Sequence, residues 1–481
     1  MAAALPTNAF ELSLDDVARA TRGVLSGAAE QRVRGISTDS RAELSGALFV
    51  ALSGERFDGH DFVDQAKARG AAAVLVEREV TTSLPVVRVT STLAALGALG
   101  QLSRKRWSGE LIAVAGSAGK TTTRAALSAL LEAAEPGAVH YARGNFNNLI
   151  GVPLVLLSLS ERERWSVVEL GTNQPGEVRT LTEMSAPDVG VLTLIGYEHT
   201  EGLGDLDGVE AEEGALFATL GAGSVAVGNV DDERVARQLA RAAGKRVGYG
   251  QQPSADYRFR VLTTTERGSE LEVERRLAGR TVSTRFRTQT LGDAGAYAAC
   301  AALCAVETLL GRELSAATLD AAFASAVASE TGRLRPVELT GDILLLDDTY
   351  NSNPESAASS VRTARTLADQ RGAKLVLVLG EMRELGALSA DLHHKLGEVA
   401  AANAPELLLG VAGDARLVVE SARARGVQCE FASDSEAAAS LLLERLTEKA
   451  VVLVKASRGV RAERVVAQLV AALGPKGGQA T

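Results

Sequence analysis

The chain has 481 residues, which corresponds to about three domains at roughly 100–200 residues per domain. Hydrophobic residues make up 46% and charged residues 23% of it, which excludes an intrinsically disordered protein. The formal net charge is −9 and no strong cluster of lysine and arginine is present, so we expect no nucleic-acid partner. No apolar run approaches the ~18–20 residues of a membrane span, and the first ten residues do not read as a secretory signal. We therefore expect a cytoplasmic protein without stable membrane insertion.

Residues 1–108 predict a small mixed α/β domain. Short apolar runs at 47–52, 72–77 and 86–89 predict strands, and helical spacing predicts helices over 61–69 and 92–105. A basic stretch followed by Ser-Gly at 104–109 is typical of a domain boundary.

Residues 109–328 show apolar strands that alternate with helical segments, which predicts a parallel sheet with helices on both faces. The predicted strands are 111–115, 167–170, 189–195 and 225–230. Polar–apolar alternation over 256–290 predicts an antiparallel ribbon inserted in this domain, and the Ala-rich segment 294–310 predicts a helix. Cys300 and Cys304 lie one turn apart in it without further ligands, so we expect small buried side chains there rather than a metal site or a disulfide.

Residues 329–481 predict a second doubly wound sheet. Its expected strands are 343–346, 374–379, 406–409 and 451–454. A cleft between two α/β domains is a usual place for an enzyme with several substrates, so we expect the site between the central and C-terminal domains.

The sharpest local signal is Gly116-Ser-Ala-Gly119-Lys120-Thr121-Thr122, which follows an apolar strand and opens a helix. Glycines let backbone amides turn toward a phosphate, and the helix N-terminus favours negative charge. Lys120 can reach the β- and γ-phosphates, and the Thr121 hydroxyl can ligate Mg²⁺. Val114 occupies the first glycine position of the long phosphate-loop pattern, which leaves a simple strand–helix turn as the alternative. The nucleotide-binding candidates here are Gly116, Ser117, Gly119, Lys120, Thr121 and Thr122.

Polar residues at other strand ends are further candidates. Glu169 ends an apolar strand and could hold Mg²⁺ beside Thr121. His199 lies in a loop where a structural role is the commoner one, and most of the acidic run 198–213 reads as a solvated loop. Residues 347–354 and 455–458, together with Arg333, are candidate ligand or anion contacts.

Longer motifs run along nearly the whole chain: Ser37-Thr-Asp-Ser-Arg41, Gly54-Glu-Arg-Phe-Asp-Gly-His-Asp61, Gly144-Asn-Phe-Asn-Asn-Leu-Ile-Gly-Val-Pro153, Glu169-Leu-Gly-Thr-Asn173, Asp347-Asp-Thr-Tyr-Asn-Ser-Asn-Pro354, Gly380-Glu-Met-Arg-Glu-Leu-Gly386 and Lys455-Ala-Ser-Arg458 with Glu463. In this order they resemble the Mur ligases of peptidoglycan synthesis. The third, fifth and sixth motifs resemble the branch of that family that adds a D-alanyl-D-alanine dipeptide.

The resemblance implies three domains: an N-terminal domain that binds a UDP-sugar substrate, a central P-loop-type ATPase domain and a C-terminal Rossmann-like domain. It implies an ATP-dependent, ADP-forming amide ligase that joins D-alanyl-D-alanine to UDP-N-acetylmuramoyl-tripeptide through an acyl phosphate. ATP and Mg²⁺ are the implied cofactors, the partners are these small-molecule substrates, and we expect a monomer.

The resemblance also assigns roles to single residues. Lys120, Glu169, His199 and Glu213 match the catalytic group, and Thr121, Glu169, His199 and Glu213 match the metal ligands. The positions that match ATP contacts are Asn229, Arg333 and Asp348, and those that match contacts of the uridine nucleotide are Ser40 and Arg41. The remaining matches to substrate contacts are Asn147, Asn148, Tyr350, Asn351, Asn353, Lys455 and Ser457.

The chain departs from the family pattern in three places. Glu213 stands where the family usually has a carbamylated lysine, and we hypothesise that its permanent carboxylate makes the site independent of CO₂. Ala294 and Gly295 stand where the family commonly has His-Asn, and Ala456 replaces a glycine. These changes leave two alternatives open: a catalytically weakened paralogue that binds nucleotide in a regulatory or scaffolding role, and a related ligase with another amine substrate.

Overall fold

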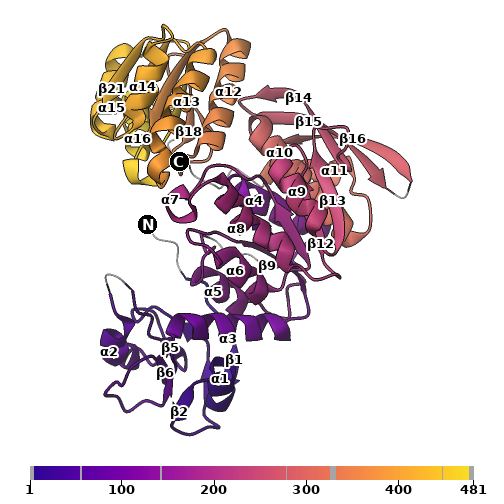
Figure 1. The fold of residues 1–481 in the computed structure, drawn as a ribbon, viewed down its shortest axis with the longest axis vertical. Coiled ribbons are helices and arrows are strands. Elements are labelled where there is room, and N and C mark those ends of the chain that lie inside the picture. Colours follow the sequence, from indigo (N-terminus) through magenta and orange to yellow (C-terminus); the bar gives the residue numbers. More distant parts are fainter. Residues whose placement is uncertain are drawn as a thin grey trace.

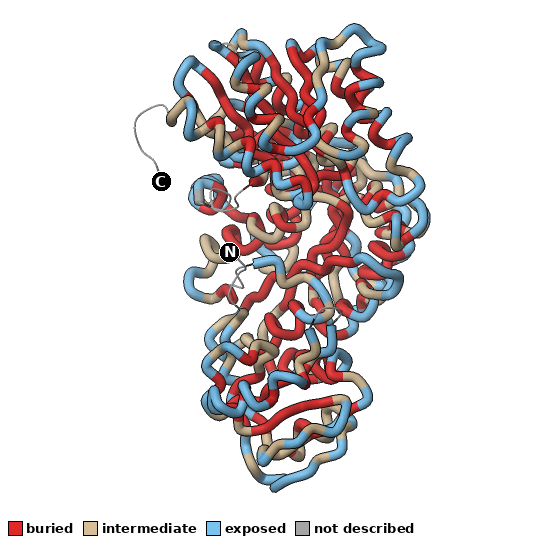
Figure 2. Tube along the Cα trace, turned by 90° about the vertical axis from the view of Figure 1, so that its left-hand side faces the viewer, coloured by how far each residue is buried: buried red, intermediate tan, exposed pale blue. Residues whose placement is uncertain are grey.

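The computed structural model describes residues 5–54, 57–140, 144–277, 279–325, 332–446 and 448–475. Three α/β domains are stacked along the long axis of the molecule, so the predicted fold class is confirmed (Figure 1). Buried residues run through the interior of all three domains, and exposed residues concentrate on outer loops and helix faces (Figure 2). The predicted limit at 108/109 falls between a helix and a strand, whereas the limit at 328/329 lies outside the described residues.

The N-terminal domain contains a five-stranded sheet with the order β2-β7-β6-β5-β4 and a separate β1–β3 pair. Apolar side chains pack in two clusters against this sheet, because its central strands are apolar on both faces. The elements are β1 (Glu11–Ser13), α1 (Leu14–Thr21), β2 (Val24–Ser26), β3 (Arg32–Arg34), β4 (Ile36–Ser37), β5 (Leu48–Val50), η1 (Gly59–Phe62), α2 (Val63–Ala68), β6 (Ala73–Val76), β7 (Val86–Arg88) and α3 (Thr92–Arg106).

Helix α3 joins this domain to the central one. The guanidinium group of Arg104, which is largely buried, donates to the Ser185 carbonyl at 3.0 Å and to the Asp188 carboxylate at 2.8 Å. Leu154 and Leu157 of the central domain complete the apolar cluster under α3. The two domains therefore share a core at this junction.

The central domain is built on a nine-stranded sheet with the order β16-β15-β14-β13-β12-β11-β8-β10-β9. One face packs against α4, α10 and α11, and the other against α5, α6, α8 and α9. The elements are β8 (Glu110–Ala115), α4 (Lys120–Ala134), β9 (Val139–His140), α5 (Gly151–Leu157), β10 (Trp165–Glu169), α6 (Glu177–Ser185), β11 (Val189–Leu192), α7 (Thr200–Leu203), α8 (Leu206–Thr219), β12 (Val225–Asn229), α9 (Glu233–Arg241), β13 (Lys245–Gly250), β14 (Tyr257–Thr265), β15 (Gly268–Leu277), β16 (Arg280–Thr288), α10 (Gly292–Leu310) and α11 (Ala316–Ser325).

Two expectations for this domain need correction. The antiparallel ribbon is present, but it is not a separate insertion, because β14 pairs in parallel with β13 and extends the main sheet. Strand β11 ends at Leu192 rather than at residue 195, because the following residues turn toward the loop after β8.

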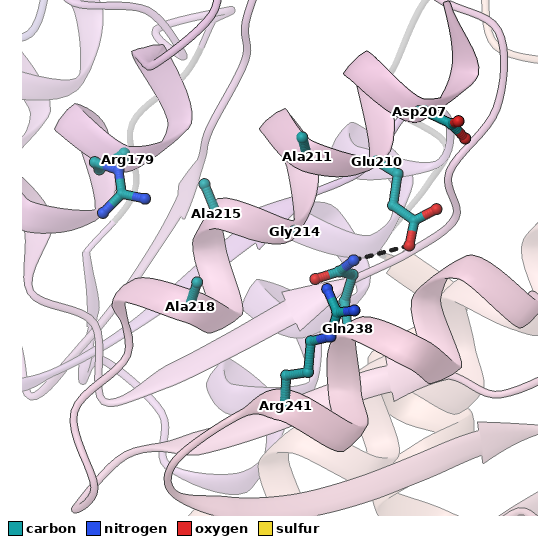
Figure 3. A pocket seen from close by; sticks show the side chains of 9 residues that line it. All are labelled: Arg179, Asp207, Glu210, Ala211, Gly214, Ala215, Ala218, Gln238 and Arg241. Atoms are coloured by element: carbon teal, nitrogen blue, oxygen red, sulfur yellow. Dashed lines mark hydrogen bonds between the residues drawn. The ribbon is translucent and has the colours of Figure 1, made fainter.

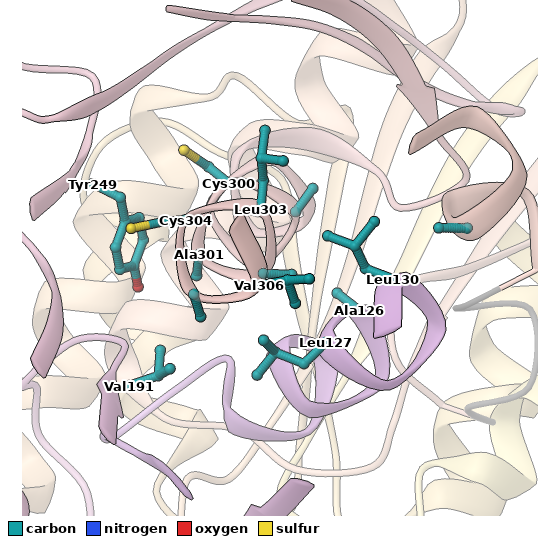
Figure 4. Close-up of a cluster of buried hydrophobic side chains, with 14 of the residues drawn as sticks. Ala126, Leu127, Leu130, Val191, Tyr249, Cys300, Ala301, Leu303, Cys304 and Val306 are labelled. Atoms are coloured by element: carbon teal, nitrogen blue, oxygen red, sulfur yellow. The ribbon is translucent and has the colours of Figure 1, made fainter. Parts of the chain in front are cut away.

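Helix α10 forms the centre of the larger core. It is the one helix of the described chain that is long and apolar enough to cross a membrane, and 67% of its apolar window is buried inside the protein. Around α10, Cys300 and Cys304 lie on the side of Tyr249, whereas Val306 lies on the side of Leu127 from α4 (Figure 4). The two cysteines are fully buried, which confirms that they are small packing residues.

The C-terminal domain contains a six-stranded sheet with the order β17-β18-β22-β19-β20-β21, in which only β17 is antiparallel among the described strands. The predicted doubly wound sheet is therefore confirmed. The elements are β17 (Arg335–Leu339), β18 (Ile343–Asp348), α12 (Pro354–Arg371), β19 (Lys374–Gly380), η2 (Gly386–Leu388), α13 (Ser389–Ala402), β20 (Leu407–Val411), α14 (Ala415–Arg423), β21 (Cys429–Ala432), α15 (Ser435–Arg445), β22 (Ala450–Lys455), η3 (Arg458–Val460) and α16 (Glu463–Leu473).

A carboxylate fastens α8 to α9. Glu210 accepts hydrogen bonds from Arg237 at 2.6 Å, from Gln238 at 2.8 Å and from Arg234 at 2.5 Å. Burial raises the pKa of Glu210, but these three donors outweigh burial and lower the pKa to about 2. The folded state thus favours the charged form of this carboxylate.

We predict that Glu210→Gln lowers the free energy of unfolding by about 2 kcal/mol at pH 7. A folded pKa below the unfolded value stabilises the protein above pH 4.5, and that stabilisation is lost as the pH falls through 2. Thermal denaturation of both proteins from pH 7 to pH 3 should therefore show a difference that shrinks below pH 4.5. Glu233→Gln, a change at an exposed glutamate of α9, is the control; a Glu210→Gln effect independent of pH would contradict the prediction.

Candidate active site

The loop between β8 and α4 has the backbone geometry of a phosphate site. Gly116 and Gly119 have φ values of 120° and 85°, a region that favours glycine. A Cβ atom on Gly116 would lie 2.2 Å from the Thr193 hydroxyl, which itself donates to the Ala118 carbonyl at 2.7 Å. The loop therefore passes close to the end of β11 and leads into the N-terminus of the 15-residue helix α4, where backbone amides attract anions.

Lys120 lies among carboxylates at the first position of α4. Its ammonium group donates to the Gly116 carbonyl and to Glu198 Oε1 at 2.8 Å. Burial lowers the pKa of Lys120, but the charges of Glu198, Glu213 and Glu169 raise it above its ordinary value. Lys120 is thus a fixed positive charge at the loop.

Thr121, Glu169 and Asn147 form one connected group beside the loop. The Thr121 hydroxyl donates to Glu169 Oε2 at 2.8 Å, and the Asn147 amide donates to Glu169 Oε1 at 3.1 Å. These side chains come from the first turn of α4, the end of β10 and the segment before α5. The sequence-predicted pair of Thr121 and Glu169 is therefore together.

Glu213 reaches the same loop from α8. Its Oε2 accepts from the Gly116 amide at 2.6 Å, and its side chain is fully buried. Its Oε1 is buried and accepts no hydrogen bond from an N–H or O–H group of the described chain. Burial raises the pKa of Glu213 to about 7, with the Lys120 charge lowering it and the Glu198 charge raising it. The carboxylates of Glu213 and Glu198 lie close together, and such a pair of like charges favours a bound cation.

His199 is held from the C-terminal domain. It immediately precedes α7 with a φ of 51°, and its Nδ1 contacts the Glu384 carboxylate. Burial lowers the pKa of His199, and this effect outweighs the Glu384 charge, which raises it. The neutral ring is therefore favoured. A neutral ring that donates through Nδ1 keeps the lone pair of Nε2 for a metal, which is the usual arrangement of a ligating histidine.

The expectation that most of the acidic run 198–213 is a solvated loop is right only for the exposed Glu201, Asp205 and Asp207. The segment forms α7 and α8, and Glu198, Glu210, Glu212 and Glu213 are all buried. Each carboxylate has a backbone amide or a cation beside it, which offsets the cost of burying the charge.

The described residues hold no preformed cluster of three histidine, cysteine, aspartate or glutamate side chains around one point. The four predicted metal ligands therefore lie in three places. Thr121 lies with Glu169, Glu213 of α8 contacts the phosphate loop, and His199 lies with Glu384. Mg²⁺ keeps several water ligands and binds proteins through one or two carboxylates plus substrate phosphates, so the Thr121–Glu169 pair fits it.

The C-terminal domain closes directly over the phosphate loop. Arg333 donates to the Thr121 hydroxyl at 2.8 Å, and Asn353 donates to the Ser117 carbonyl at 3.0 Å. On the other side of the loop, the Thr200 hydroxyl donates to the Leu385 carbonyl at 3.0 Å. The two domains therefore meet at the predicted nucleotide site.

Asp348 organises the C-terminal wall of the site. It accepts hydrogen bonds from Lys455 at 2.7 Å, from Ser360 at 2.6 Å and from the Leu334 amide at 3.1 Å. Tyr350 lies two residues further on, and its ring contacts the Arg333 guanidinium at 4.1 Å. Arg333 is thus placed between Tyr350 and the phosphate loop.

A cleft of about 1360 Å³ lies between the central and C-terminal domains. This is large enough for a nucleotide and leaves room beside it. Ten of the predicted site residues line it: Ser117, Gly119, Thr122, Asn229, Arg333, Asp348, Tyr350, Asn351, Asn353 and Lys455.

A second hollow, of about 310 Å³, lies over the outer side of α8, between α6 and α9 (Figure 3). Its walls include Arg179, Ala211, Gly214 and Arg241, and none of the predicted site residues lines it. The candidate site is therefore the larger cleft.

Four predicted substrate contacts have other partners in the structure. Ser40 donates to Gln65 at 2.9 Å and Arg41 pairs with Asp39, both in the N-terminal domain. The other two are loop anchors: the Asn148 side chain accepts from the Gly151 amide at the start of α5, and the Ser457 hydroxyl accepts from the Arg383 amide. Their substrate roles stay predictions. In the motif 54–61, residues 55 and 56 lie outside the described residues.

Sequence reasoning missed Glu198 and Glu384. Glu198 immediately precedes His199, and Glu384 lies inside the motif 380–386. A glutamate in a loop does not by itself indicate a contact with a buried side chain. Only the approach of Lys120 and of His199 from other elements gives them a role.

The departures from the family pattern fit their surroundings. Ala294 and Gly295 lie in the wall of the large cleft. A Cβ atom on Gly295 would lie 2.3 Å from the Thr290 side chain, so Thr290 takes the space that a side chain at 295 would need. The methyl group of Ala456 is buried against Gly380.

We predict that Gly295→Ala lowers the free energy of unfolding by about 1–3 kcal/mol, because the new methyl group collides with Thr290. ATP should also raise the melting temperature less in this variant than in the wild type, because both residues line the cleft. Removing the Thr290 side chain in the double variant Gly295→Ala/Thr290→Gly should recover part of the loss relative to Thr290→Gly alone. Ala294→Ser, on the same wall, is the control; equal behaviour of the two single variants would contradict the prediction.

The sequence matches three family models in chain order. They are "Mur ligase family, catalytic domain" over residues 32–104, "Mur ligase middle domain" over 114–306 and "Mur ligase, glutamate ligase domain" over 332–458. The UDP-N-acetylmuramoyl-tripeptide–D-alanyl-D-alanine ligase of Escherichia coli (strain K12) is 34% identical over 465 residues, which are 96% of this chain and 98% of that protein.

Solved structures give the same result for the fold. A crystal structure of MurF from Acinetobacter baumannii aligns with a TM-score of 0.86 at 28% identity, covering 97% of this chain and all of that one. MurF from Thermotoga maritima in complex with ADP aligns with a TM-score of 0.78 at 28% identity, covering 90% of this chain and 96% of that one.

Proposed function

We propose that this chain, which belongs to the Mur ligase family, is an ATP-dependent, ADP-forming ligase that joins D-alanyl-D-alanine to UDP-N-acetylmuramoyl-tripeptide in peptidoglycan synthesis. The observation that carries the proposal is the Arg333–Thr121 contact, which brings a cation of the C-terminal domain onto the phosphate loop. A ligase of this kind needs both domains around the phosphate that is transferred.

The chemistry sets the demands on the site. The tripeptide carboxylate attacks the γ-phosphate, which gives an acyl phosphate and ADP, and the dipeptide amine then displaces phosphate to form the amide. The first step brings an anion onto a polyanion, so it depends on charge neutralisation and alignment more than on covalent help. Lys120 and Arg333 supply two positive charges at the loop, and the α4 amides hold the phosphates.

Domain closure protects the reaction from water. The contacts of Asn353 with the loop and of Thr200 with Leu385 hold the C-terminal domain over the site. An acyl phosphate hydrolyses readily, so exclusion of water favours attack by the amine.

Thr121 and Glu169 would hold Mg²⁺ at the phosphates, and Glu213 and His199 would hold a second ion. When bound, the metal neutralises charge on the phosphate oxygens. Asn229 and Asp348 are the proposed ATP contacts of the cleft, and Ser40 and Arg41 the proposed contacts of the uridine nucleotide. We place the enzyme in the cytoplasm as a monomer.

The test is release of ADP and phosphate by the purified protein with ATP, Mg²⁺, UDP-N-acetylmuramoyl-tripeptide and D-alanyl-D-alanine, omitting each in turn. We expect release only in the complete mixture, with a pentapeptide product by mass spectrometry. Lys120→Ala should lower kcat at least 10²-fold, because the developing charge loses a fixed cation. ATP binding without turnover across several amines would instead support the weakened paralogue.

We predict that the wild-type rate does not change when bicarbonate is added or CO₂ is removed, because Glu213 supplies its carboxylate without carbamylation. Glu213→Gln keeps the shape and removes the charge, so it should lower kcat about tenfold or more. Steady-state rates in degassed and bicarbonate-supplemented buffer measure both effects. Stimulation of the wild type by bicarbonate would overturn the idea.

A further inference from the structure

Arg458 is a cation beside the active site that the proposed reaction has not used. It opens η3, three residues after the end of β22, and its side chain is exposed. Its guanidinium carbon lies 5.9 Å from the centre of the Tyr350 ring. No carboxylate of the described residues forms an ion pair with it, whereas Lys455 in the same motif is paired with Asp348 at 2.7 Å. Arg458 thus keeps its five hydrogen-bond donors for a ligand.

The neighbouring arginine is also close. The Arg383 guanidinium packs against Gly459, the residue after Arg458, and only its Nε pairs with Glu381, at 3.1 Å. The backbone of Arg383 is fastened to Ser457. The surroundings of Arg458 therefore favour an anion.

Tyr350 relates Arg458 to the reaction centre. The same ring carries the Arg333 guanidinium at 4.1 Å, and Arg333 contacts the Thr121 hydroxyl of the phosphate loop. Because both guanidinium groups lie against one ring, their carbons are at most roughly 10 Å apart. An extended dipeptide spans ~7 Å from its amine to its carboxylate. A dipeptide whose amine lies beside Arg333 and the phosphates would thus bring its carboxylate within reach of Arg458.

We propose that Arg458 binds the C-terminal carboxylate of the incoming dipeptide. This inference rests on the proposed function, and it adds the group that recognises the amine substrate. Guanidinium and carboxylate form two parallel, charge-assisted hydrogen bonds, which fix both the charge and the orientation of the ligand.

The experiment combines an enzyme variant with a substrate variant. Arg458→Ala should raise the KM for D-alanyl-D-alanine about 10–100-fold and leave the KM for ATP and for the UDP-linked tripeptide unchanged. D-alanyl-D-alaninamide, which lacks the carboxylate, should be a similarly poor substrate of the wild type. Arg458→Ala should use the dipeptide and its amide equally well, because each change removes the same contact. Arg458→Lys should recover only part of the lost affinity, since a lysine lacks the planar fork.

Arg461→Ala is the matched control, because this exposed arginine lies three residues further on and has no ion pair within the described chain. It should leave all three KM values unchanged, and the melting temperatures of the variants should match that of the wild type.

An unchanged dipeptide KM in Arg458→Ala, or a wild type that accepts the amide as well as the dipeptide, would overturn this inference while the ligase activity stands. A wild type that releases no ADP with the dipeptide would instead overturn the proposed function, and this inference with it.

Discussion

The hydrogen bond from Arg333 to Thr121 is the contact on which the working arrangement of this protein depends. It joins a residue near the start of the C-terminal domain to the first turn of α4, where the helix amides and Lys120 already concentrate positive potential. The Asn353–Ser117 and Thr200–Leu385 contacts hold the same two domains together, and Tyr350 lies beside Arg333 at their junction. The reaction requires an anion to approach a polyanion, and the contact of the two domains brings the Arg333 cation to the phosphate loop.

A buried charge network surrounds that contact. Lys120, Glu198 and Glu213 come from two helices and a loop, and the two glutamates are buried. Removing Lys120 would leave two buried carboxylates without their shared cation, which costs several kcal/mol. The Gly116 amide, which donates to Glu213, makes the phosphate loop itself part of the network.

The secondary structure near the site followed from local patterns. Strand β8, the glycine loop and helix α4 were predicted because an apolar run, two glycines and Lys-Thr-Thr are all local features. The edge of the central sheet could not be predicted in this way. A contact between strands decides whether the ribbon 256–290 stands alone or pairs with β13. The burial of four glutamates in the segment 198–213 could not be predicted for a similar reason. The amides and cations that surround these carboxylates come from other elements.

The sequence by itself determined the three α/β domains, the phosphate loop, the family and ten of the residues that line the cleft. These depend on apolar periodicity and on motifs whose residues lie close together along the chain. Only the tertiary structure decided that Glu384 orients His199, that Thr290 takes the space beside Gly295 and that Arg458 shares the Tyr350 ring with Arg333. Each of these depends on the approach of side chains from separate elements, which packing sets and no local pattern encodes.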